Sequence, residues 1–178
     1  SSLDPIEKAG RAALSDRLMS QGAGDLDSSS FAATVERLGI QLDVGTPTWS
    51  SYIAVSCHKD QLATALSMVS DMIVAPHYKG KDVRRERTLS IMDIAAGMED
   101  PVSIGRRLAL SLYFGAGSPW SHPSDGTEEG LKALKTKDLL AYHHLVWTPG
   151  GAKITVSGAV TSAEITGLLE QSLGAWAK

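Results

Sequence analysis

The sequence has 178 residues, of which 43% are hydrophobic and 21% are charged, and its formal net charge is -3. This length and composition suffice for one domain with a proper hydrophobic core, and they exclude a disordered chain. The small negative charge argues against a protein that binds nucleic acid through a basic patch. No apolar run approaches the ~18 residues that a membrane-spanning helix needs, so we expect no membrane span.

Two further features are the single cysteine and the residue with which the sequence begins. Its one cysteine, Cys57, cannot form an internal disulfide, and we predict that it is an inert buried residue. The sequence begins at Ser1 without an initiator methionine. We therefore expect a piece of a longer protein, with any targeting signal outside these residues.

The first predicted elements are two helices. Residues 9–22 carry an apolar stripe at helical spacing, with Asp4-Pro5 as a helix start before them and Gly22 as their end. The polar residues 27–30 can cap a second helix over residues 31–38, which a glycine stops.

A β-hairpin is predicted over residues 40–57. Apolar and polar residues alternate over residues 40–44, which is typical of a strand with one wet face. Residues 52–57 are rich in β-branched side chains and predict the returning strand. A turn around Pro47 joins the two strands.

Three helices and a loop follow the hairpin. Asp60 is predicted to cap the first of these helices, and Asp100-Pro101 to start the last. The helices are expected over residues 62–75, 79–98 and 101–114, and the loop over residues 115–126, which are rich in Gly, Ser and Pro.

The C-terminal part is predicted as helix, strand and helix, over residues 135–147, 153–160 and 161–175. His143 and His144 lie on the first of these helices. Neighbouring residues on a helix point about 100° apart, so this pair is not a chelate.

This order of elements predicts an α+β, two-layer fold, with helices packed on one face of an antiparallel sheet. Three strands are few for so many helices, so we expect further strands in an absent N-terminal part or in a partner. The hairpin and the 153–160 strand would then leave an unprotected edge, which favours self-association into a homo-oligomer or pairing with another domain. The four tryptophans (Trp49, Trp120, Trp147 and Trp176) are candidates for the core or an interface.

Several short pieces of the sequence are weak signals alone, but their joint order is specific. They are residues 4–10 (DPIEKAG), 35–42 (VERLGIQL), 63–76, 99–101 (EDP), 112–115 (LYFG), 118–120 (SPW), 126–127 (GT), 147–149 (WTP), 156–160 (VSGAV) and 173–176 (LGAW). Together they resemble the insulinase/pitrilysin family of zinc peptidases, also called the mitochondrial-processing-peptidase-like family, which carries an inverted H-x-x-E-H motif. The resemblance implies the LuxS/MPP-like metallohydrolase fold.

The same resemblance locates the family's zinc site on this sequence. It places the two histidines on Ala13 and Arg17, the glutamate base on Asp16, and the third ligand, a glutamate, on Asp93. Alanine has no ligand atom, arginine stays protonated, and two carboxylates do not hold zinc because three protein ligands are usual. We therefore predict no metal, no cofactor and no catalytic residue at these positions.

Two interpretations of the remaining charges stay open. An Arg17–Asp93 ion pair could brace the two helices in place of the metal. Alternatively, Asp16, Arg17 and Asp93 could be ordinary surface charges.

The resemblance also implies a role. It identifies residues 1–178 as a single domain, similar to the first domain of an inactive half of the family. The predicted function is a non-catalytic domain that forms a chamber and helps to bind peptide together with a catalytic H-x-x-E-H half or subunit. The resemblance favours the bacterial periplasm or cytoplasm and leaves a mitochondrial location open.

Two other functions remain as alternatives. One is a structural assembly subunit without a proteolytic role, like the core subunits of respiratory complexes that resemble this family. The other is an active zinc peptidase, which would need metal ligands from outside these residues.

Overall fold

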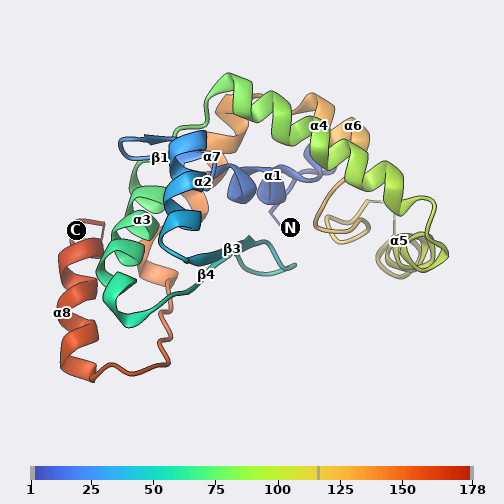
Figure 1. The fold of residues 1–178 in the computed structure, drawn as a ribbon. Helices are drawn as coiled ribbons and strands as arrows, with labels where there is room; N and C mark the ends of the chain where they lie inside the picture. Colours follow the sequence, from blue (N-terminus) through green and yellow to red (C-terminus); the bar gives the residue numbers. More distant parts are fainter. Residues whose placement is uncertain (1–2, 116, 177–178) are drawn as a thin grey trace. The chain divides into compact units, whose positions relative to one another are not determined.

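The computed structural model describes residues 3–115 and 117–176 of the chain (Figure 1). The chain divides into two compact units, each treated by itself below. The first comprises Ser1–Leu18, Val44–Tyr52 and Tyr78–His143, and the second comprises Met19–Asp43, Ile53–His77 and His144–Lys178. No helix among the described residues is long and apolar enough to cross a membrane.

The first unit is helical and contains the sequence-predicted site. Its helical elements are the 3-10 turn η1 (Ile6–Lys8) and the helices α1 (Arg11–Leu18), α4 (Gly80–Gly97), α5 (Pro101–Phe114), α6 (Glu128–Ala133) and most of α7 (Thr136–Val146). Helix α1 packs against α4 and α6, and α6 also contacts α4 and η1. The buried apolar residues include Leu14, Leu18, Val83, Leu131 and Leu139.

The second unit packs helices around a short β-ribbon. It contains β1 (Gly22–Ala23), β2 (Leu26–Asp27), α2 (Ser28–Arg37), the 3-10 turns η2 (Lys59–Gln61) and η3 (Pro149–Gly151), α3 (Leu62–Val74) and α8 (Ser162–Leu173). Strand β1 pairs antiparallel with β2, with Gly22 opposite Asp27 and Ala23 opposite Leu26. Helices α3 and α8 lie side by side (Figure 1).

The predicted hairpin is present as a second two-stranded sheet, made of β3 (Gln41–Gly45) and β4 (Tyr52–Ser56). Each of these strands contributes residues to both units. The chain is therefore a mixed helical fold with small sheets, which confirms the α+β class. The two-layer arrangement stays a prediction.

The predicted strand over residues 153–160 is wrong. No strand forms there, and Ile154 and Val156 are 54% and 42% exposed. In the described part of the chain, the backbone of residues 153–160 makes no hydrogen bond to other backbone groups. A strand needs a neighbour to pair its N–H and C=O groups, and alternation of side chains alone cannot supply that neighbour.

Several predicted ends and caps also differ. Helix α1 stops at Leu18, and Gly22 lies in β1 with a φ of 105°, a conformation that glycine adopts readily because it has no β-carbon. Asp4-Pro5 was predicted to start a helix, but the element that follows it is the short 3-10 turn η1. The Asp4 carboxylate instead accepts a hydrogen bond from the N–H of Ala12, eight residues away. Cys57 is partly exposed instead of buried.

The predicted cap at Asp60 is wrong as well. The side chain of His58 caps η2 by accepting from the Asp60 N–H, and α3 begins without a side-chain cap. In contrast, Asp27 and Asp100 cap α2 and α5 as predicted, because each is followed by N–H groups that its carboxylate can reach.

Candidate functional site

The candidate site is built on one face of α1. Ala13, Asp16 and Arg17 share that face because they stand three and four residues apart. The start of α1 is held close to the loop before α6, where Gly126 has a φ of 87° and any β-carbon on it would overlap the backbone of Ala9. This close approach positions the loop that carries Asp125 beside the helix.

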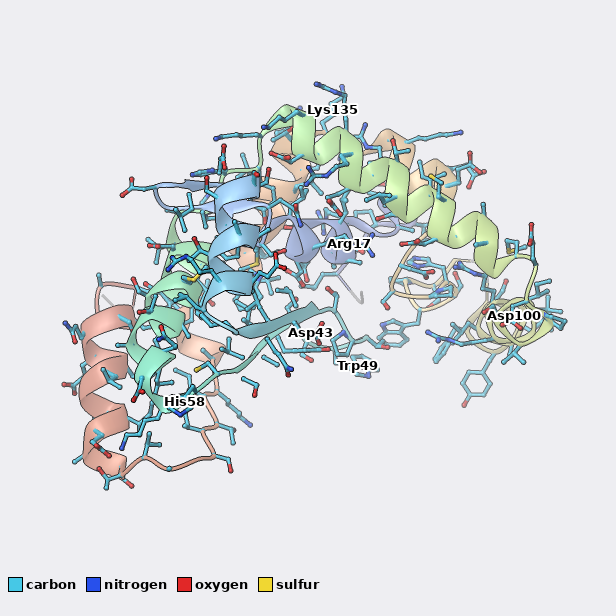
Figure 2. All side chains as sticks on the ribbon, viewed as in Figure 1. Arg17, Asp43, Trp49, His58, Asp100 and Lys135 are labelled. Carbon is cyan, nitrogen blue, oxygen red and sulfur yellow. The ribbon has the colours of Figure 1, made fainter. Side chains whose placement is uncertain are left out.

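Arg17 is held against one face of α4. Its Nη1 and Nη2 atoms lie 3.3 Å and 3.2 Å from Asp93 Oδ2, and Nη1 donates to the Ser90 hydroxyl at 3.1 Å. Its Nε atom lies 3.9 Å from the carboxylate of Glu86, which is buried. The Arg17–Asp93 ion pair is therefore present, and it links α1 to α4. Figure 2 labels Arg17 on α1.

Sequence reasoning found Asp93 but missed Glu86 and Ser90. The signal was available, because residues three and seven positions before Asp93 fall on the same face of a helix. The dense charges at the start of α4 obscure this signal, because a charge run on a helix is most often a solvated face.

Asp16 is fully buried and holds the segment that joins β3 to β4. Its carboxylate accepts a hydrogen bond from Thr46 Oγ1 at 2.7 Å and another from Ser51 Oγ. The Ser51 hydroxyl also lies 3.3 Å from the hydroxyl of Tyr142. Asp16 is therefore not a surface charge, which decides against that interpretation for this residue.

Two further buried hydrogen bonds hold α1 in place, both through Ser15. The Tyr78 hydroxyl donates to the backbone oxygen of Ser15 at 2.9 Å, and the Ser15 hydroxyl donates to the backbone oxygen of Leu139 at 3.1 Å. Burial raises the pKa of Tyr78 above its ordinary value, so this phenol keeps its proton. The proton is needed because Tyr78 is the donor to Ser15.

A cavity of about 220 Å³ opens beside this face of α1. Its wall carries charges of both signs and several hydroxyl groups. The residues that line it include Ala13, Arg17, Thr46, Ser90, Asp93 and Asp125. Asp125 is in turn paired with Arg107 of α5.

The side chains at this site do not fit a zinc ion. Ala13 offers no donor atom, and the guanidinium of Arg17 puts a positive charge beside Asp93, where a zinc ion would need a ligand. The described residues contain no group of three or more His, Cys, Asp or Glu side chains that could hold a metal. With Thr46 and Ser51 bonded to it, Asp16 is a structural acceptor.

Comparison with known proteins gives a family match over most of the chain. The sequence model described as insulinase (peptidase family M16) matches residues 1–117. This agrees with the resemblance that the order of short motifs indicated.

Two curated relatives align with much of the chain at low identity. An uncharacterized zinc protease of Mycobacterium leprae is 24% identical over 166 residues, which are 93% of this chain and 37% of that protein. The non-peptidase homolog YmxG of Helicobacter pylori is 22% identical over 138 residues, which are 78% of this chain and 32% of that protein. The chain thus spans about a third of the length of these relatives.

A solved structure shares the fold. The peptidase M16 inactive domain from Pseudomonas fluorescens superposes with a TM-score of 0.83 and 19% sequence identity. The match covers 96% of this chain and 42% of that one.

Proposed function

The chain belongs to the insulinase family of peptidases, family M16, and on that premise we propose that it is a non-catalytic domain that works beside a catalytic one. The observation that carries the proposal is the contact of Arg17 with Asp93, Ser90 and the nearby Glu86. A permanently charged guanidinium stands where the family's second histidine would stand. In a zinc peptidase the metal activates water, and a protonated guanidinium, which is neither a metal ligand nor a base, does not supply that activation.

The burial and the hydrogen bonds of Asp16 support the same proposal. This carboxylate stands where the family's base would stand, but it is fully buried and bonded to the hydroxyls of Thr46 and Ser51. A base must lie within reach of a water or substrate proton. Asp16 instead stabilises the segment between β3 and β4, a structural role that a non-catalytic domain can retain.

The catalytic partner in this proposal is an H-x-x-E-H half of the same longer protein, or a separate subunit. The matches cover only 37% and 32% of the lengths of the two relatives, and one protein of the same fold is the peptidase M16 inactive domain from Pseudomonas fluorescens. We infer that the domain closes one side of a chamber around an extended peptide and helps to hold it. The strands that complete a two-layer, LuxS/MPP-like sheet would come from the same longer protein.

The experiment compares the chain, the catalytic H-x-x-E-H half or subunit, and their mixture, with an unstructured fluorogenic peptide as substrate. We expect the chain alone to be inactive and the mixture to cleave faster than the catalytic part alone. Hydrolysis by the chain alone that Asp16→Asn abolishes, or a mixture no faster than the catalytic part, would contradict the proposal.

A further inference from the structure

Helix α5 carries an apolar face that the described part of the chain leaves exposed. None of its residues is buried, and no other described helix or strand packs extensively against it. Residues 102, 105, 109 and 112 recur three or four positions apart and therefore lie on one side of the helix. The most exposed apolar side chains of α5, from 57% to 84%, are Val102, Leu108, Leu112 and Tyr113.

The helix is held in place by contacts that leave this face open. A helix of 14 residues is marginal alone in water, and in proteins most helical stability comes from the packing of an apolar face. Here Asp100 caps the first turn. Arg107, on the side opposite the apolar face, pairs with Asp125 and donates to the backbone oxygen of Gly126. The apolar face is therefore a preformed surface, which loses little conformational entropy on binding.

Gly105 indicates what kind of partner fits this face. It stands in the middle of α5, where glycine is destabilising relative to alanine. A β-carbon on it would meet no atom within 4 Å outside the backbone of its own helix, and its φ is not positive. No contact within the described chain therefore requires the glycine. On an exposed apolar face, a glycine lets the backbone of a second helix approach closely.

The sequence of α5 is nearly a palindrome, which indicates that the second helix is another α5. Residues at equal distances on either side of Arg107 belong to the same class in four pairs: Val102 and Leu112, Ser103 and Ser111, Ile104 and Leu110, and Gly105 and Ala109. When two identical helices pack antiparallel about a two-fold axis, residues at equal distances from the axis meet each other. With the axis at residue 107, Val102 meets Leu112 of the second copy at each end of the contact. Gly105 meets Ala109 near the centre, where the two helices approach most closely.

The charges around α5 agree with a second copy as the partner. The Arg107 guanidinium is paired with Asp125 on the far side of the helix, so it does not enter the contact. Antiparallel packing places the positive N-terminal end of each helix dipole beside the negative C-terminal end of the other. Arg106 flanks the apolar face and repels its counterpart in the second copy, so added salt should strengthen the association.

The size of the face predicts a weak dimer. Helix α5 is about 21 Å long and about 10 Å across, so its footprint is well below the ~800 Å² per partner of a standard interface. Tyr113, which is 84% exposed, extends the contact at each end, opposite Pro101 of the second copy. We therefore expect a dissociation constant on the order of 10–100 µM.

We propose that α5 is a self-association surface, on which two copies of this chain pack their α5 helices antiparallel around residue 107. Gly105 and Ala109 form the close central crossing, and Val102, Leu108 and Leu112 pack on either side of it. The inference goes beyond the proposed function, because this contact needs neither a catalytic partner nor a peptide. It also uses no residue of the site on α1.

Sedimentation velocity tests the surface with the 178-residue chain. From about 1 µM to about 500 µM, the chain should show a monomer–dimer equilibrium that high salt does not weaken. Leu108→Asp buries a charge in the contact and should weaken association by roughly tenfold or more. Gly105→Leu should have the same effect by blocking the close approach, although it adds apolar surface. Val74→Asp is the matched control, because Val74 is as exposed as Leu108 (57%) but lies on α3, and this variant should dimerise like the wild-type chain.

Cross-linking with a short bismaleimide tests the antiparallel packing. In a Cys57→Ser background, Val102→Cys and Leu112→Cys are treated separately and as a mixture. The mixture should cross-link much faster than either variant alone, because the two copies of residue 102 lie about 15 Å apart along the helix axes. A parallel pair would instead cross-link each variant to itself.

Four results would overturn the inference. The chain stays monomeric over the whole concentration range, or Leu108→Asp keeps its fold by circular dichroism and dimerises like the wild-type chain. Gly105→Leu associates more tightly than the wild-type chain, which would indicate an unspecific apolar surface, or Val102→Cys cross-links to itself as fast as to Leu112→Cys. Each of these results leaves the proposed function standing, because the cleavage experiment does not depend on α5 pairing.

Discussion

At the scale of single residues, the two acidic positions of the degenerate site have opposite environments. Asp16 is fully buried, whereas the side chain of Asp93 is 66% exposed and that of Arg17 is 43% exposed. The family resemblance singles out both acids but cannot separate them, because the burial of Asp16 depends on the segment between β3 and β4. Thr46 and Ser51 donate hydrogen bonds to Asp16 from 30 and 35 residues away in the sequence, and no local sequence pattern predicts such contacts.

This difference predicts unequal effects on stability. Asp16→Ala removes a fully buried acceptor from the hydroxyls of Thr46 and Ser51 and should lower the free energy of unfolding by roughly 3 kcal/mol. Asp93→Ala breaks an exposed ion pair and should cost only about 0.5 kcal/mol. Urea unfolding followed by circular dichroism measures both values. Equal effects, or a larger one for Asp93→Ala, would show that the buried contacts of Asp16 carry little stability.

The ion pair between Lys8 and Asp138 predicts how the stability of the fold changes in acid. The Lys8 ammonium, 2.8 Å from the Asp138 carboxylate, holds the pKa of that carboxyl below its ordinary value. A carboxyl with a depressed folded-state pKa stabilises the fold above its unfolded pKa, and this contribution is lost as pH falls through the folded-state value. Urea midpoints of wild type and Asp138→Asn should therefore differ at pH 6 and converge toward pH 2. A difference that is constant with pH would contradict the assignment.

At the scale of elements, the sequence predicted those whose signals are local. The hairpin strands, the caps Asp27 and Asp100, and the long helix α4 follow from alternation, capping and periodicity. The ribbon of β1 and β2 and the six-residue helix α6 are too short to show a period. Residues 153–160 alternate like a strand, but their pairing depends on a neighbour that local pattern cannot reveal.

Hydrogen exchange tests the structure of this last segment. Because the backbone of residues 153–160 forms no hydrogen bond to backbone groups in the described chain, its amides should exchange at nearly unprotected rates. Amides in the middle of α3, which contains buried residues, should exchange far more slowly and serve as the internal reference. Protection at residues 153–157 equal to that of α3 would mean that the segment is paired in the free chain.

At the scale of the whole molecule, the family could be predicted from sequence because its short motifs keep their order over nearly the whole chain. The predicted larger sheet stays a prediction, because the structure holds β3 and β4 as a two-stranded sheet and further pairing depends on neighbouring strands. The chain spans 37% of the Mycobacterium leprae relative and 42% of the Pseudomonas fluorescens structure. Self-association through a sheet edge and the pairing with a catalytic half therefore stay predictions that need the longer protein.

We propose that a guanidinium has replaced the metal at the helix that carries Ala13, Asp16 and Arg17. Zinc content tests this replacement most directly: the purified chain is incubated with excess zinc, dialysed, and analysed by mass spectrometry. We predict far less than one zinc per chain, with no change on Asp16→Asn or Asp93→Asn, because neither acid has an imidazole beside it. One zinc per chain that either substitution removes would show instead that these carboxylates hold a metal.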